Sequence, residues 1–290
     1  MELLPGMVTK GVDFSNIELT RALLRNIEVE GKDCLDLGIM EGMFTTLLVR
    51  RGASKVVGYD YVTRTPHIDL VRATLGLDFE YISGMKLGNL RAELQKRGHR
   101  PFDVVLFSGV LYHMFDPLAG LALARGLVRD GGILLLETAC VVDDHMGMYF
   151  NAEGRFYPGT NFWQVSVPCL DYLLRFLRLQ AIDCAYFLTP KAHRTTLPLA
   201  RACVICYAVD HFLPDPDDTW MTKGRNPHYA QFLNWNELVS NEPPVPYQDS
   251  QDTLVQRPSG EAIDLYHSMK GMPQFNVGSI DRTLALGAKY

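Results

Sequence analysis

Strand-like and helix-like hydrophobic patterns alternate through the first half of the chain. Nearly continuous apolar runs predict buried strands at residues 33–37, 54–60, 78–82, 102–107 and 133–138. Apolar residues at helical spacing predict helices at residues 17–27, 43–51, 69–75, 87–97 and 118–128, the last ended by a turn at residues 129–132. Apolar strands that alternate with helices are typical of a parallel sheet covered on both faces, so we expect an α/β fold.

The pattern changes after residue 140. Residues 143–160 are polar and contain glycine, which predicts a long loop, and a helix at 170–179 and strands at 182–188 and 202–209 follow. From residue 210 onward, prolines and scattered aromatic residues replace the regular pattern. We therefore predict a helical lead-in (1–29), a sheet domain (30–209) and a C-terminal extension (210–290) that acts as a lid, a packing arm or an oligomer contact.

Composition and charge narrow the classes of function. The chain has 290 residues, of which 47% are hydrophobic, which is enough to bury a core. It has 28 basic and 33 acidic residues, a net charge of −5 that argues against a protein that follows a nucleic-acid backbone. The start shows no secretory leader, no apolar run is long enough for a membrane span, and the six cysteines lie in apolar segments. We expect a cytoplasmic protein with buried thiols.

The segment from Asp36 to Phe44 follows the first strand of the sheet domain and leads into a helix. Gly38 allows the backbone to turn sharply, and Gly42 allows the start of the helix to approach a ligand. Asp60 ends the next strand, where a carboxylate can accept hydrogen bonds from both hydroxyls of a ribose. Sheets of this kind bind ligands beyond the carboxyl ends of their strands, so this segment is a candidate nucleotide site.

Two ligands are compared for this segment. A nicotinamide cofactor requires a Gly-x-Gly-x-x-Gly loop around its pyrophosphate, but Met40 stands at the middle glycine and the third is missing. Asp36 would repel a pyrophosphate and attract an ammonium group, which S-adenosylmethionine carries. The residues therefore favour S-adenosyl-L-methionine as the cofactor. Two alternatives stay open: an α/β domain with no nucleotide and ordinary turn glycines, and helix-capping or turn roles for Asp36 and Asp60.

Three further motifs carry a resemblance to a known family. They are Gly109-Val110-Leu111-Tyr112-His113, Leu135-Leu136-Glu137-Thr138, and Thr160-Asn161-Phe162-Trp163 with Pro168 before a helix. With the donor segment, they resemble class I S-adenosylmethionine-dependent methyltransferases, above all the catalytic half of tRNA wobble-uridine carboxymethyltransferases and their small-molecule relatives. The resemblance covers about residues 30–209. It implies a seven-stranded, Rossmann-like sheet that is mostly parallel with a final antiparallel strand.

The resemblance also implies a set of donor contacts at the strand ends. Gly38 and its neighbours face the methionyl part, and Asp36 fixes its ammonium. Asp60 takes the ribose hydroxyls. The remaining contacts are Tyr61, Gly84 and Met85 beside the adenine and Ser108, Gly109 and Tyr112 beside the methionyl part.

The acceptor side is less defined by sequence. His113 is the first candidate for the general base, because histidine titrates near neutrality, and Glu137 is the second. The alternatives are that His113 packs on the following helix and that Glu137 makes a structural hydrogen bond to the loop after Asn161. An aromatic run predicts a wall or lid over a planar, partly apolar acceptor, or packing of the loop onto the sheet; its candidate acceptor contacts are Tyr149, Tyr157, Asn161 and Trp163.

These residues predict S-adenosylmethionine-dependent methylation of a small molecule, most readily at oxygen, in specialised-metabolite biosynthesis. One alternative is a tRNA-modifying methyl- or carboxymethyltransferase, although those enzymes carry a sizeable N-terminal domain and a basic surface. Another is a non-catalytic donor-binding or scaffold protein, with Met40 as a sign of decay. No metal ligand set is predicted, and the extension is compatible with a homodimer.

Overall fold

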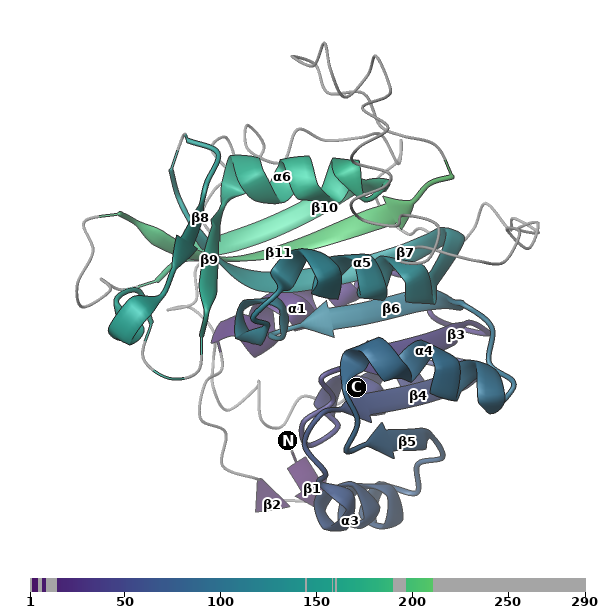
Figure 1. Cartoon of the computed structure of the whole chain (residues 1–290). Helices are drawn as coiled ribbons and strands as arrows, with labels where there is room; N and C mark the ends of the chain where they lie inside the picture. Colours follow the sequence, from purple (N-terminus) through teal and green to yellow (C-terminus); the bar gives the residue numbers. More distant parts are fainter. Residues whose placement is uncertain are drawn as a thin grey trace.

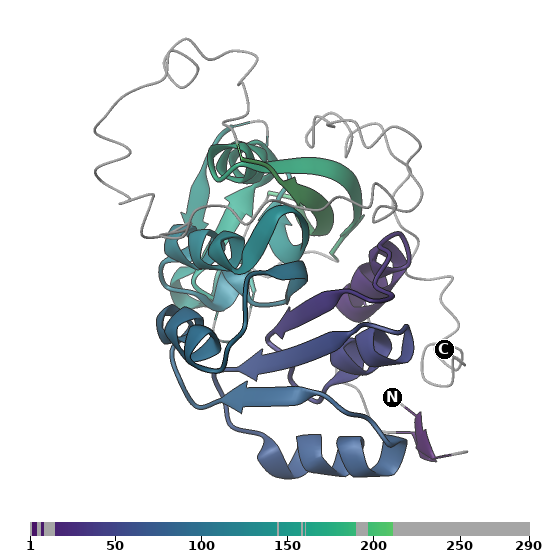
Figure 2. The same ribbon diagram turned by 90° about the vertical axis from the view of Figure 1, so that its right-hand side faces the viewer.

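The computed structural model of the chain describes residues 2–4, 7–8, 15–143, 145–157, 159, 161–189 and 197–210. The predicted C-terminal extension, and with it the expected homodimer contact, lies outside these residues apart from Asp210. Within the described part, a central sheet has helices on both faces (Figures 1 and 2). The α/β class is therefore confirmed.

Seven strands form the continuous path of the sheet. Their order is β10 (Leu179–Leu188), β11 (Leu199–Ala208), β7 (Val128–Val141), β6 (Phe102–Ser108), β3 (Asp33–Leu37), β4 (Lys55–Asp60) and β5 (Glu80–Ser83). The pairs from β7 to β5 are parallel, whereas β11 is antiparallel to both β7 and β10. This arrangement confirms the mostly parallel, seven-stranded sheet whose last strand in the chain is antiparallel.

Two apolar layers hold the helices against the sheet. One face is covered by α1 (Ser15–Leu24), α2 (Met43–Arg50) and α3 (Thr65–Leu75), and the other by α4 (Leu87–Lys96), α5 (Pro117–Leu127) and α6 (Val167–Phe176). Leu35 and Leu37 of β3 point to the second layer, and Cys34 points to the first. Both faces of the strand are thus buried, which is typical of a parallel strand covered by helices on both sides.

The start of β7 differs from the prediction. The glycine-containing segment Arg129–Gly132 was expected to be a turn, but it lies inside the strand, which follows α5 directly. The register against β6 shifts between Phe102 and Val104, and Gly131 has a φ of 77°. Glycine is needed at 132 because a Cβ there would lie 2.9 Å from the carbonyl oxygen of Asp103. These glycines therefore serve a strand irregularity rather than a turn.

The predicted loop at 143–160 also contains regular structure. It holds β8 (Met148–Phe150) and the short 3-10 helix η2 (Ala152–Gly154), and β9 (Trp163–Ser166) follows it. β9 pairs with β8 and with the end of β7, so the whole sheet has nine strands among the described residues. Helix α6 also ends earlier than predicted, at Phe176. Strands of three and four residues are too short to give a recognisable hydrophobic period.

The first residues are only partly helical. β1 (Glu2–Leu4) and β2 (Met7–Val8) form a two-stranded antiparallel pair that was not predicted, and α1 begins at Ser15. Helix α1 lies against β7, β10 and β11. This position brings the helix beside the carboxyl-terminal half of β7, which matters for the site.

Candidate donor and acceptor site

Gly38 makes the turn that connects β3 with α2. It has a φ of 89°, and its amide donates to the carbonyl oxygen of Tyr59 on the neighbouring strand. A Cβ at this position would overlap Cγ2 of Val110, from the segment that follows β6. Glycine is therefore required both for the left-handed backbone and for the close approach of the two strand ends.

Met40 keeps the conformation that glycine usually supplies. Its φ is 47°, its side chain is 56% exposed, and its amide donates to Oδ2 of Asp60 at 3.0 Å. Oδ1 of Asp60 accepts from the amide of Val62 at 2.9 Å. The turn thus survives the loss of the middle glycine. Asp60 therefore has the turn role that was the alternative to ribose binding. Each of its carboxylate oxygens still has a second lone pair that can accept a hydrogen bond from a ligand.

Asp36 is the more deeply buried of the two carboxylates. Its side chain is 2% exposed and accepts a hydrogen bond from Oγ1 of Thr45 at 2.7 Å. Burial raises the pKa of Asp36 to about 6, against the hydrogen bond from Thr45, and the negative charge of Asp60 adds to the rise. Two carboxylates at one sheet edge, one of them poorly solvated, suit a cationic ligand better than a phosphate.

The candidate adenine contacts lie at the ends of β4 and β5. Tyr61 is exposed, Gly84 has a φ of 76°, and the amide of Gly84 donates to the carbonyl oxygen of Asp60 at 3.3 Å. The carbonyl oxygen of Met85 accepts from the hydroxyl of Tyr59 at 2.7 Å. The structure therefore places these residues at the edge where Asp60 lies, and their contact with adenine stays a prediction.

The segment after β6 brings several site residues together. Oγ of Ser108 lies 2.8 Å from Oγ1 of Thr20 on α1, and the amide of Gly109 donates to the carbonyl oxygen of Glu137 at 3.0 Å. A Cβ at Gly109, whose φ is 74°, would lie 3.5 Å from the hydroxyl of Tyr112 and 3.9 Å from Oε2 of Glu137. Gly109 therefore lies against a small group of polar side chains that includes Tyr112 and Glu137.

Arg201 completes this group and was not predicted. From β11, its Nε donates to Oε1 of Glu137 at 2.7 Å and its Nη2 donates to Oε2 at 2.8 Å. Nη2 also donates to the Tyr112 hydroxyl at 3.1 Å, and the guanidinium lies 4.5 Å from the centre of the tyrosine ring. Burial opposes the charge of Arg201, but the attraction of Glu137 outweighs it and raises the arginine pKa.

The Arg201–Glu137 ion pair bears on which of the two candidates, His113 or Glu137, can act as the general base. Glu137 is fully buried, and both of its oxygens accept from Arg201, so this arginine is a structural partner of the carboxylate. His113 ends the 3-10 helix η1 (Leu111–His113), is exposed, and places its ring 4.3 Å from that of Tyr112. The geometry therefore favours His113 over Glu137 as the base, a role that stays a prediction.

A buried asparagine organises the loop that follows β8. Nδ2 of Asn151 donates to the carbonyl oxygens of Tyr157 at 2.8 Å and Asn161 at 2.9 Å, and its Oδ1 accepts from the amide of Phe156 at 2.7 Å. Phe156 packs in a cluster with Val141 of β7. The aromatic run therefore packs onto the sheet, as one of the two interpretations held.

The four residues predicted to contact the acceptor do not all lie together. Tyr149 and Tyr157 pack beside Phe156, and their hydroxyls donate to Asp143 and to Thr189 respectively. Trp163 instead lies at an apolar pocket on the other side of β9, where its Nε1 donates to the carbonyl oxygen of Phe115 at 2.9 Å. The backbone of Asn161 is tied to Asn151 between the two groups.

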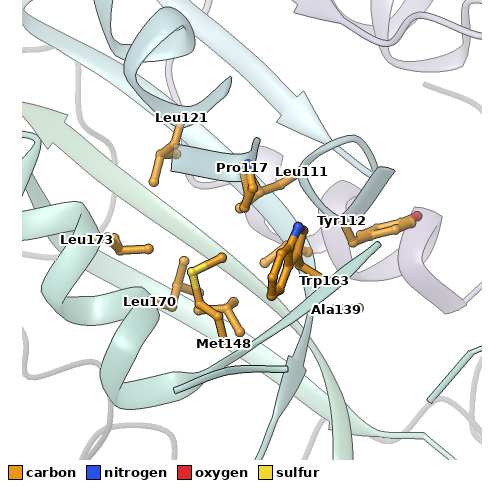
Figure 3. Close-up of a pocket in the computed structure, with 11 residues that line it drawn as sticks. Leu111, Tyr112, Pro117, Leu121, Ala139, Met148, Trp163, Leu170 and Leu173 are labelled. Atoms are coloured by element: carbon orange, nitrogen blue, oxygen red, sulfur yellow. The ribbon is translucent and has the colours of Figure 1, made fainter. Parts of the chain in front are cut away.

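The apolar pocket lies between η1, α5, α6 and the strand ends. Tyr112 stands at one end of it, and Trp163 and Met148 line its middle (Figure 3). Thr138 supplies a hydroxyl, and the rest of the lining is mainly aliphatic and aromatic: Leu111, Pro117, Leu121, Ala139, Val165, Leu170 and Leu173. Because Tyr112 also touches Arg201, the pocket adjoins the polar group around Glu137.

The described part of the chain holds no cluster of three or more His, Cys, Asp or Glu side chains arranged for a metal ion. All six cysteines are buried and free, as expected. None of the helices described combines the length and the apolarity needed to cross a membrane.

Residues 15–182, more than half of the chain, match the family model described as a methyltransferase domain. The chain belongs to this family. The expectation of a class I S-adenosylmethionine-dependent methyltransferase domain is thereby confirmed, with S-adenosylmethionine as its methyl donor. That Asp36, Gly38 and Asp60 contact this donor stays a prediction.

Named relatives differ in the acceptor they use. The chain is 30% identical to the tRNA U34 carboxymethyltransferase of Azotobacter vinelandii over 166 residues, which is 55% of this chain and 50% of that protein. It is 34% identical to the ubiquinone biosynthesis O-methyltransferase of Cereibacter sphaeroides over 122 residues, which is 42% of this chain and 47% of that protein. The chain thus spans about half the length of the curated relatives it matches.

A solved structure supports the fold independently. The cyclase SpnF, at 13% identity, superposes with a TM-score of 0.50 over 66% of this chain and 80% of that chain. At this identity the likeness shows the fold alone.

Proposed function

We propose that this methyltransferase transfers a methyl group from S-adenosylmethionine to a hydroxyl oxygen of a small, partly apolar molecule in specialised-metabolite biosynthesis. The observation that carries the proposal is the apolar pocket bounded by Tyr112 and Trp163. It adjoins the segment after β6, where Gly109 lies beside the Tyr112 hydroxyl. Apolar pockets beside a few polar groups bind small molecules in many proteins. This pocket has a volume of only about 10 Å³, so in the proposal it takes no more than an apolar edge of the acceptor.

Charge supports a small acceptor over RNA. The net charge is −5, and eight arginines of the described residues pair with carboxylates: Arg21, Arg64, Arg72, Arg97, Arg125, Arg129, Arg175 and Arg201. Positive charge that is already neutralised in this way contributes less to phosphate binding. The ubiquinone biosynthesis O-methyltransferase among the relatives supports oxygen as the attacked atom.

The donor edge assigns roles to the residues of this chain. In the proposal, Asp60 binds the ribose hydroxyls, Asp36 attracts the ammonium, and Tyr61 lies beside the adenine, next to Gly84 and Met85. S-adenosylmethionine supplies an electrophilic methyl group on its sulfonium. The side chains after β6 then have to align the acceptor hydroxyl with that methyl group.

His113 is the residue that receives the hydroxyl proton in this proposal. It stands on the rim beside Tyr112, and its exposure lets it pass the proton to solvent. Arg201, which Glu137 holds in place, donates to the Tyr112 hydroxyl and lies over its ring. In this proposal, Tyr112 separates the donor edge from the apolar pocket. Tyr112 and Gly109 are positioning residues in this scheme.

The donor half of the proposal is tested by calorimetric titration of the full chain with S-adenosylmethionine and its demethylated product. We expect a single site for each. A chain that binds neither molecule contradicts the donor site.

The acceptor half is tested with methyl-tritiated S-adenosylmethionine and two acceptor fractions, a small-molecule cell extract and bulk tRNA. We expect label in the small-molecule fraction only, in a product whose methyl group is bonded to oxygen by NMR. Label that enters tRNA instead supports the RNA alternative. Donor binding without transfer to either fraction supports the non-catalytic alternative.

A further inference from the structure

Phe115, in the segment between η1 and α5, is an aromatic side chain open to solvent. It is 70% exposed, the highest value for a large hydrophobic residue among those the structure describes. Phe150 of β8 is 47% exposed, and Phe162 and Trp163 are partly exposed. We call these four residues the aromatic patch. Exposed apolar groups that gather in one place mark a binding site in many proteins.

The members of the aromatic patch contact one another in two ring pairs. Phe115 and Phe162 lie 5.6 Å apart at an interplanar angle of 82°, and Phe150 and Trp163 lie 5.0 Å apart at 62°. The hydrogen bond from Nε1 of Trp163 to the carbonyl oxygen of Phe115 joins the two pairs. In an edge-to-face pair, one ring contributes only its edge, so ring faces stay available for a further aromatic ring.

The aromatic patch lies beside the candidate base. Met114 has an extended backbone (φ −86°, ψ 134°), and a Cβ at Gly120 of α5 would overlap its sulfur, so its side chain packs against that helix. His113 and Phe115, on either side of Met114, are both exposed. Across an extended residue their Cα atoms are separated by roughly 7 Å. A ring that rests on Phe115 is therefore within reach of His113.

The aromatic patch also continues the apolar pocket. Trp163 lines the pocket (Figure 3) and packs against Phe150. The volume of the pocket, about 10 Å³, is about what a single water molecule needs. Because a ring system cannot enter so small a space, the body of an acceptor whose edge fills the pocket has to lie outside it. The exposed rings of the patch are the apolar surface next to that opening.

The ring geometry selects the chemistry of this body. An aliphatic group gains only from the burial of its surface, whereas a flat aromatic system also gains from stacked and edge-to-face contacts with the exposed rings. Two ring pairs side by side offer more contact than a single six-membered ring can use. The patch therefore fits a fused aromatic system better than an isolated ring or an aliphatic chain.

We propose that the aromatic patch binds a flat, fused-ring aromatic alcohol, with Phe115 as a specificity-determining residue and with the hydroxyl directed toward His113. The proposal rests on the proposed function, since it names the class of acceptor for the same site.

The test uses the full chain saturated with S-adenosylhomocysteine and two probes that share one carbon skeleton. 2-Naphthol is flat and aromatic, and decahydro-2-naphthol is its saturated counterpart. NMR titration should show that the wild type binds 2-naphthol about tenfold more tightly, with the naphthol protons shifted upfield by the rings of the patch. Phe115→Leu, which keeps an apolar side chain, should remove this preference and leave decahydro-2-naphthol unaffected. Phe115→Trp should keep the preference.

Stability and oligomeric state separate this role from others. Because Phe115 is mostly exposed, the Tm of Phe115→Leu should stay within about 2 °C of the wild-type value. The control is Leu70→Ala on α3, an exposed apolar residue outside the patch, which should leave the affinities for both probes unchanged. If Phe115→Leu converts a dimer into a monomer in analytical ultracentrifugation, the patch is a contact between copies of the chain, which overturns the inference.

Two further failures can be told apart. A wild type that does not bind S-adenosylhomocysteine overturns the proposed function. A wild type that binds it but shows no preference for 2-naphthol, or a Phe115→Leu variant that keeps the preference, overturns this inference alone.

Discussion

Arg201 of β11 and Glu137 of β7 form a buried, two-pronged ion pair, with nitrogen–oxygen distances of 2.7 and 2.8 Å. The glutamate is fully enclosed, and the arginine reaches past it to the hydroxyl of Tyr112. The two charges therefore depend on each other, and the hydrogen bond to Tyr112 depends on the arginine that Glu137 holds in place.

Removing the charge of either Glu137 or Arg201 alone should lower the stability of the protein. Glu137→Gln leaves a buried guanidinium without its counter-charge, so we expect the free energy of unfolding to fall by about 3–5 kcal/mol in urea titrations. Arg201→Met should cost a similar amount. The double variant Arg201→Met/Glu137→Leu should recover most of the loss, because no uncompensated charge remains.

The matched control is the partly exposed pair between Glu93 of α4 and Arg97 just after the helix, where the nitrogen–oxygen distance is also 2.7 Å. Glu93→Gln should change stability by less than about 0.5 kcal/mol. Losses that simply add in the double variant would show that Arg201 and Glu137 act independently.

The place of Arg201 in the site could not be predicted from the sequence. The strand predicted at 202–209 begins one residue after it, so the prediction does not assign Arg201 to a strand. β11 begins at Leu199, and only its register against β7 brings residue 201 to Glu137. An antiparallel pairing across more than sixty residues leaves no local pattern, although an arginine at the edge of an otherwise apolar run is a signal that it needs a partner.

The parallel half of the sheet was predictable because its strands do leave a local pattern in the sequence. β3, β4 and β6 are buried on both faces along most of their length, whereas in β5 only Ile82 is buried. All four strands are bounded by a glycine or a charged residue, and their bounds agree with the predicted ones to within two residues. The donor residues follow directly from these strand ends. The acceptor side is built from β8, β9 and a loop held by Asn151, and these depend on tertiary contacts that short segments do not encode.

Asp60 should dominate donor binding. Asp60→Ala removes the acceptor of the ribose hydroxyls and also releases the amide of Met40 from the β3–α2 turn. We expect the affinity for S-adenosylhomocysteine to fall about a hundredfold in calorimetry, equivalent to about 2.7 kcal/mol. The control is Asp78→Ala, whose side chain is fully exposed, and its affinity should equal that of the wild type. If the affinity of Asp60→Ala for S-adenosylhomocysteine stays within threefold of the wild-type value, Asp60 acts in the turn only and does not bind the donor.

Asp36 should make donor binding depend on pH. Its pKa is raised from 3.8 to about 6 by burial, so the folded chain takes up a proton more readily than the unfolded one between these values. Stability should therefore fall as the pH rises from about 4 to 6, and the ionised form costs about 3 kcal/mol above that range. The ammonium of the donor is attracted only by the ionised form, so donor affinity should rise between pH 5 and 7.

Asp36→Asn separates the two effects. At pH 7.5 we expect its ligand-free Tm to rise, because no buried charge remains, while its affinity for S-adenosylhomocysteine falls and no longer changes between pH 5 and 7. Thermal unfolding and calorimetry at matched pH values measure both. The same pH profile in wild type and variant would show that Asp36 does not contact the ammonium.

Gly38 should tolerate no side chain, for two separable reasons. Alanine there would have to adopt a φ of 89° and would overlap Cγ2 of Val110. We expect Gly38→Ala to lose about 3 kcal/mol of stability and most donor affinity, because the strand ends are pushed apart. Gly76→Ala, with a φ of 62° and open space around its Cβ, carries only the backbone cost of about 1 kcal/mol. Val110→Ala in the Gly38→Ala background removes the overlap, so it should restore part of the stability in urea titrations. If Val110→Ala restores nothing, the backbone conformation alone accounts for the glycine.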